Sequence, residues 1–187
     1  MVRLRVFTAC LALAFAVGFS GKSSAQSASN DPTVATHISL EDIETTLGNA
    51  PADRVSDQQI RHIDAGAHGY IGLGVLHRPV KAAGTPIGAI QHHNQSEMYV
   101  VLSGSGTLVT KATMSNSRLL DPEGDTVRLL TGPSSSGVIE DGGHSRDIKT
   151  GDVVIIPANV AHGFSVIGEP INYLVFRVDP ERLLELK

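Results

Sequence analysis

Regularly spaced β-rich runs are the feature that most constrains how this chain can fold. In the stretch 70–78, bulky residues alternate with glycines, which is the period-two pattern of a half-buried strand. Four further runs rich in β-branched residues and tyrosine lie at 98–102, 107–110, 152–156 and 171–178. Helical periodicity is scarce, so the predicted fold class is all-β, a sandwich or a small barrel. The Gly-Ser-Gly triplet at 104–106 predicts a hairpin turn.

A single short helix is predicted ahead of the strands. Ser39 and Asp42 have the spacing of a capping box, in which a hydroxyl and a carboxylate three residues later each accept a backbone N–H. Gly48 and Pro51 should end this helix, because both residues disfavour continued helix.

The first 25 residues have the composition of a secretory signal peptide. Arg3 and Arg5 precede an uncharged apolar run at 6–19, which is too short for a comfortable membrane span. Small residues then lead to Ala25, where we expect cleavage; cleavage after Ala28 and an uncleaved anchor are the alternatives. The predicted location is therefore secreted or periplasmic, with no stable membrane span after cleavage.

The rest of the chain divides into two predicted parts. Residues 26–37 are rich in serine, alanine and asparagine and are expected to form a flexible lead-in. Residues 38–187 have the length of a single domain.

Composition excludes several classes of function. The chain has 187 residues and a formal net charge of −4, which offers no basic surface for nucleic acid. Its one cysteine, Cys10, excludes a disulfide framework and a cysteine-rich zinc module. Eight histidines beside only 15 lysines and arginines are a surplus of the commonest side-chain metal ligand.

Two segments concentrate the candidate chemistry. Residues 91–97 contain His92, His93 and Glu97, and residues 151–162 end at His162. Each segment places imidazole at the end of a predicted strand. If the two ends meet, their nitrogen and oxygen donors suit one first-row divalent metal ion such as Fe, Mn, Ni or Zn.

These segments resemble the two motifs of the cupins, a superfamily of small double-stranded β-helix (jelly-roll) proteins. The second motif matches at Gly151, Pro157 and His162, with Asn159 in place of a glycine. Asparagine tolerates the left-handed conformation that such a turn requires. The resemblance implies an all-β cupin barrel over roughly residues 70–178.

The first motif departs from the family pattern. Glu97 and Gly104 fit, but neither register before Glu97 restores the family's His-x-His. One register makes His92 a ligand and leaves three donors, His92, Glu97 and His162. The other makes His93 a ligand and adds the weak amide oxygen of Gln91.

Alternation along the strands predicts further residues around the site. Ile71, Leu73, Val75 and His77 share one face, and branched side chains favour the core, so His77 is expected to point inward. It is a candidate acid/base or extra ligand, with a hydrogen-bonded core histidine as the alternative. Tyr99 and Phe164 are expected to line the substrate pocket, with ordinary core packing as the alternative.

The resemblance implies a metal-dependent enzyme for a small-molecule substrate. The expected reaction is that of an oxygenase (an oxidoreductase) on an organic acid or phenol, or of an isomerase or lyase on a sugar-like substrate. A non-catalytic ligand-binding module is the alternative, and a homodimer is expected because cupins often pair. The long insert at 107–150, with a flexible loop predicted at 131–137, is a candidate lid or recognition segment.

Overall fold

The computed structural model describes residues 33–84 and 87–186. The predicted signal peptide and most of the predicted lead-in at 26–37 lie outside these residues. Within the described part of the chain, every helix is too short or too polar to cross a membrane.

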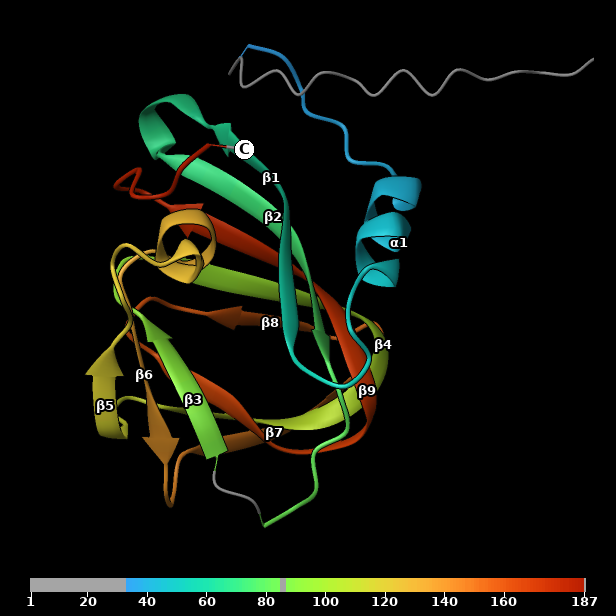
Figure 1. Ribbon diagram of the computed structural model, residues 1–187, viewed down its shortest axis with the longest axis vertical. Coiled ribbons are helices and arrows are strands. Elements are labelled where there is room, and N and C mark those ends of the chain that lie inside the picture. The colour runs from blue at the N-terminus through green and yellow to red at the C-terminus, as the bar shows by residue number, and fades with distance from the viewer. Residues whose placement is uncertain (1–32, 85–86, 187) are drawn as a thin grey trace, which may run out of the picture.

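The helix α1 (Leu40–Gly48) forms where the capping box predicts it. The Ser39 hydroxyl accepts the backbone N–H of Asp42, and the Asp42 carboxylate accepts the backbone N–H of Ser39. The helix packs against strands β1 (Ser56–Asp64) and β2 (Tyr70–Arg78), outside the barrel (Figure 1). The segment that follows α1 reaches β2, where the carbonyl oxygen of Ala52 lies 3.4 Å from Nε2 of His77.

Antiparallel strands make up the body of the protein. In the described residues they are, in chain order, β1 (Ser56–Asp64), β2 (Tyr70–Arg78), β3 (Ile87–His92), β4 (Ser96–Lys111), β5 (Ser115–Leu119), β6 (Ser134–Ile139), β7 (His144–Lys149), β8 (Val153–Ile156) and β9 (Ala161–Asp179). Two short helical turns, η1 (Gly66–His68) and η2 (Thr126–Thr131), interrupt this series. The predicted all-β fold class is confirmed.

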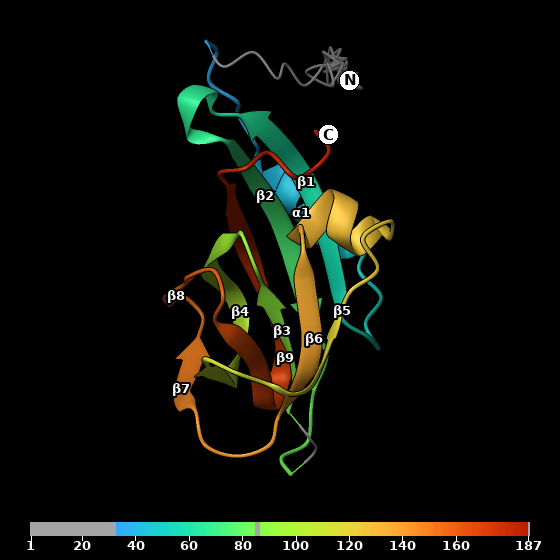
Figure 2. The same ribbon diagram turned by 90° about the vertical axis from the view of Figure 1, so that its left-hand side faces the viewer.

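Two long bent strands, β4 and β9, join the two halves of the barrel. The N-terminal half of β4 pairs with β8 and with the C-terminal half of β9, which in turn pairs with β2 and then β1. The C-terminal half of β4 pairs with β7 and with the start of β9. The start of β9 also pairs with β3, which pairs with β6, and β6 pairs with β5. The sheet therefore folds over on itself as a jelly roll (Figure 2).

The hairpin predicted at 104–106 is wrong. The chain continues through this triplet as strand β4, and its pairing with β9 shifts register there. Gly104 has φ of +79°, and a Cβ atom at this position would lie 2.0 Å from the carbonyl oxygen of Pro170. The glycine thus bends a strand at the corner of the barrel instead of reversing the chain.

The inward face of β2 is the opposite of the predicted one. Ile71 is 38% exposed, whereas Leu76 and Arg78 line the central cavity. A Cβ atom on Gly72 would collide with the ring of His62 from β1, so the glycine face is the one that leaves room for a neighbouring side chain. The prediction placed the branched residues inside because it did not take into account the His62 side chain of β1, which lies against Gly72.

The insert between the motifs is more ordered than the sequence indicates. Most of the loop predicted at 131–137 belongs to strand β6, which pairs along the whole length of β3. Residues 107–150 also hold the end of β4, strands β5 and β7, and the turn η2. The main hydrophobic core is formed by side chains of β2, β4, β7, β8 and β9 and includes Leu108, Ile171, Tyr173 and Val175.

Candidate metal centre

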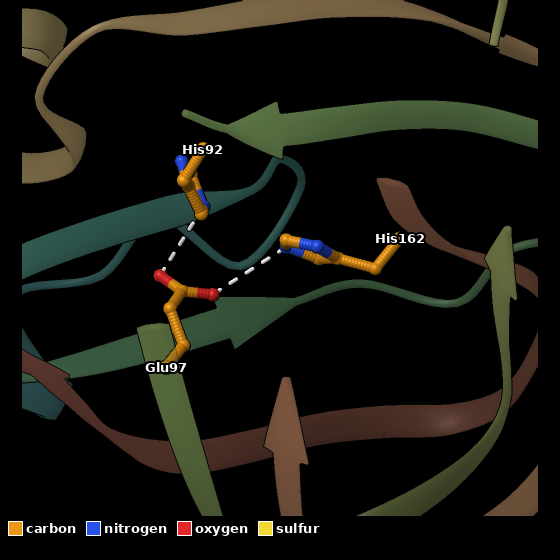
Figure 3. Close-up of side chains that lie close together, drawn as sticks. All are labelled: His92, Glu97 and His162. Atoms are coloured by element: carbon orange, nitrogen blue, oxygen red, sulfur yellow. Dashed lines mark ion pairs between the residues drawn. The ribbon is translucent and has the colours of Figure 1, made fainter. Parts of the chain in front are cut away.

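Three strands bring His92, Glu97 and His162 together inside the barrel. His92 ends β3, Glu97 lies near the start of β4, and His162 lies near the start of β9. The Nε2 atoms of His92 and His162 lie 3.3 Å and 3.4 Å from the two oxygens of the Glu97 carboxylate. Figure 3 shows both imidazoles directed at this carboxylate. All three side chains are buried, at 2–4% exposure.

The hydrogen bonds on the far side of each ring decide where the imidazole protons lie. Ser134 has one hydroxyl hydrogen, which it donates to the carbonyl oxygens of Thr131 and Gly132, so its oxygen accepts from Nδ1 of His92, 2.9 Å away. Nδ1 of His162 donates to the carbonyl oxygen of Val160 at 3.0 Å. In the neutral rings, both Nε2 atoms therefore carry a lone pair.

Arg177 and Tyr99 hold the Glu97 carboxylate in its ionised form. Burial by itself would raise the pKa of Glu97, but the charge of Arg177 holds that pKa well below its usual value. Nε of Arg177 and the hydroxyl of Tyr99 each donate to one carboxylate oxygen, both at 2.8 Å. Burial lowers the pKa of His92, which keeps this ring neutral.

These donors fit a divalent cation. Two nitrogen lone pairs face an ionised carboxylate, and Nε2 of His162 has no hydrogen-bond partner among the described residues. Electron-rich atoms at such distances repel one another unless a cation lies between them. The three donor atoms all lie within 4.8 Å of one another. Two imidazoles and one carboxylate suit Fe, Mn, Ni or Zn, and leave positions for substrate or water.

A cavity of about 530 Å³ opens directly on this cluster. Its wall includes Tyr99, Arg177 and Arg78, together with Asp57 from β1. The turn η2 from the insert adds Thr126, Leu130 and Thr131. This volume accommodates a small molecule, as the predicted substrate class requires.

Of the predicted site residues His93, Phe164 and Tyr99, only Tyr99 lies in the cavity wall. His93 points away from the cluster, and its Nε2 lies 2.9 Å from the hydroxyl oxygen of Ser135. Phe164 is buried in the main core, where its ring packs against Tyr173, and it is not part of the cavity wall. Tyr99 is both a member of the core and part of the cavity wall.

The expected inward orientation of His77 is wrong. Its Nδ1 lies 2.7 Å from the amide oxygen of Asn172, and its Nε2 lies 3.4 Å from the carbonyl oxygen of Ala52. His77 therefore occupies the outer face of β2, beneath the segment that follows α1. Its neighbour Arg78 lies on the opposite face of the strand and is the residue that reaches the cavity.

Sequence reasoning missed the residues that support the ligands. Arg177 lies 80 residues from Glu97 in the chain, and its Nη atoms also donate to Asp57. No local motif marks such a pair. A single charged residue in the apolar stretch at 171–178 was the one available signal, because buried arginine is rare without a partner.

The two neighbouring histidines allow a direct test of the ligand set. We expect His92→Ala to lose bound metal, because it removes one of the three converging donors. His93→Ala should keep wild-type metal content, since its ring faces Ser135. Elemental analysis of both purified variants measures this difference. Equal metal contents in the two variants would contradict the assignment of His92.

Comparisons with known proteins concern the fold. No protein-family model matches the chain, and no curated protein matches it. The chain is similar to the cupin domain of Schizosaccharomyces pombe Cnp3, with 11% identity over 71% of each chain and a TM-score of 0.43. It is also similar to ectoine synthase from P. lautus, with 14% identity, 79% and 78% coverage and a TM-score of 0.44.

A third similar structure is the DMSP lyase DddQ from Ruegeria pomeroyi, with 15% identity and a TM-score of 0.41. The match covers 78% of this chain and 56% of the lyase, so the chain spans little more than half of that protein. The folded-over antiparallel topology, together with the two sequence motifs, defines the fold here as the double-stranded β-helix of the cupins.

Proposed function

We propose that this protein is a metal-dependent enzyme that acts on a small molecule, either as an oxygenase or as an isomerase or lyase. The observation that carries this proposal is the convergence of two imidazole lone pairs and one ionised carboxylate on a cavity of substrate size. The donor set supports this proposal, because a fold by itself does not determine the reaction. We further propose that the protein is secreted or periplasmic.

A bound divalent ion would supply Lewis acidity or dioxygen activation. The chain's own residues provide the remaining parts of the site. Arg177 and Tyr99 orient the Glu97 carboxylate, and Ser134 and the Val160 carbonyl orient the two imidazoles. Burial of all three ligands excludes water from their far sides. The turn η2 forms part of the cavity wall. The insert therefore has a role in substrate selection.

One observation favours a non-catalytic binding module as the second candidate. In the His92 register, Ile90 occupies the family's first histidine position, and it lines the cavity. The donor set is therefore smaller than that of an intact cupin motif. A barrel that only binds a ligand needs no open coordination position on a metal, so it tolerates the absence of the first histidine.

The test combines metal content with turnover. The protein is purified after growth with Fe, Mn, Ni and Zn, and its bound metal is measured before and after chelation. Stoichiometric metal that chelation removes, with loss of substrate turnover or oxygen uptake, is the expected result. Oxygen uptake separates an oxygenase from an isomerase or lyase. Stoichiometric metal without turnover on a broad panel favours the binding module, and absence of metal overturns the metalloenzyme proposal.

A further inference from the structure

A second guanidinium, that of Arg78, lies in the wall of the same cavity as the three ligands. Its Nε donates to the hydroxyl of Tyr173 at 2.8 Å, and its central carbon lies 5.2 Å from the centre of the Phe164 ring. These contacts hold the stem and one edge of the group. Its two Nη groups have no hydrogen-bond partner among the described residues.

Arg78 is half-buried and, in the described part of the chain, forms no ion pair with a carboxylate. The other arginine of the cavity wall, Arg177, pairs with both Glu97 and Asp57. Because arginine stays charged at physiological pH, this half-buried positive charge has only the longer-range attraction of Asp57, a carboxylate that already pairs with Arg177. An anion that enters the cavity would compensate the charge of Arg78.

Two tyrosines with rings in contact, Tyr99 and Tyr173, connect Arg78 to the ligand cluster. The Tyr99 ring lies 6.2 Å from the ring of His162 and 4.3 Å from the ring of Tyr173, whose hydroxyl binds Arg78. The cation and the cluster therefore face one cavity and are separated by the width of these side chains. A molecule with two oxygen-bearing groups can reach both.

We propose that Arg78 is the specificity-determining residue of the cavity and that the substrate is a small organic carboxylate. The carboxylate would pair with the free Nη groups of Arg78, while a second oxygen of the substrate faces His92, Glu97 and His162. Guanidinium groups match carboxylates in shape and charge, which favours this class over neutral sugars. The contact between the second oxygen and the ligand cluster rests on the proposed function. The contact between the carboxylate and Arg78 does not.

The test compares each acid with its uncharged amide. Wild-type protein is titrated in a calorimeter with 2-hydroxypropanoate and 2-hydroxybenzoate, and with 2-hydroxypropanamide and 2-hydroxybenzamide. The variants are Arg78→Met, which keeps the apolar stem, Arg78→Lys, which keeps the charge, and Arg146→Met, which removes an exposed arginine on β7 as the control.

We expect at least one acid to bind wild type about tenfold or more tightly than its amide. Arg78→Met should remove this preference and leave amide binding and metal content unchanged. Arg78→Lys should retain part of the preference, and Arg146→Met all of it. The proposal is overturned if no acid is preferred by wild type, if Arg78→Met keeps the preference, or if that variant loses acid, amide and metal together, as a purely structural role predicts.

Titration of the metal-free protein separates this proposal from the one on which it builds. Arg78-dependent acid binding that persists in protein without metal supports the anion site, even if the metalloenzyme proposal fails. Full metal content with no preference for acids would overturn the anion site and leave the metalloenzyme proposal intact.

Discussion

Replacing Arg177 with methionine is expected to lower the free energy of unfolding by about 3–5 kcal/mol. The guanidinium is 1% exposed and pairs with Glu97 and Asp57, so its removal leaves the buried Glu97 carboxylate without its nearest positive charge. For a domain of this size, that loss corresponds to a fall in the melting temperature of roughly 6–20 °C. Urea denaturation of the metal-free protein at pH 7 measures the loss without interference from bound cation.

A double-mutant cycle tests the cause of this effect. If the loss arises from an uncompensated carboxylate, Glu97→Gln combined with Arg177→Met should be less destabilised than the sum of the two single variants. Arg54→Met, which breaks an exposed pair with Asp53, is the control and should be indistinguishable from wild type. Strict additivity in the cycle would show that Arg177 contributes through packing and not through its charge.

Replacing Glu97 with glutamine is expected to weaken metal binding by more than roughly 100-fold, since loss of a supporting residue alone costs 10–100-fold. The substitution keeps the size of the side chain but removes the only carboxylate of the donor set. Metal at a hundred times the wild-type dissociation constant should stabilise wild type by about 2.7 kcal/mol and the variant by less than about 0.4 kcal/mol. Thermal denaturation with and without each metal measures this difference.

Two further variants control the Glu97 experiment. Glu169→Gln changes an exposed carboxylate on β9 and should bind metal as wild type does. His162→Ala removes a ligand but leaves the pair of Glu97 with Arg177 intact, so it separates loss of metal from loss of stability. Wild-type metal stabilisation in both Glu97→Gln and His162→Ala would mean that the ion binds elsewhere.

Local patterns in the sequence were sufficient for much of the fold. The capping box at Ser39, the strand at 70–78 and the left-handed turn residue Asn159, with φ of +64°, all depend on neighbours in the chain. The triplet at 104–106 misled because glycine serves both tight turns and strand bends, and only the close approach of Pro170 decides between them.

The sequence by itself determined the ligand candidates, because the spacing of two motifs places histidine and glutamate at strand ends. It left His92 and His93 as alternatives, since a strand can present either of two adjacent residues inward. Only the tertiary structure decided that His92 joins the cluster, that Arg78 and not His77 reaches the cavity, and that Arg177 supports Glu97. The physical reason is that the direction in which a strand residue points depends on which side chains fill the space on the other side of the barrel. Strands distant in the sequence occupy that space.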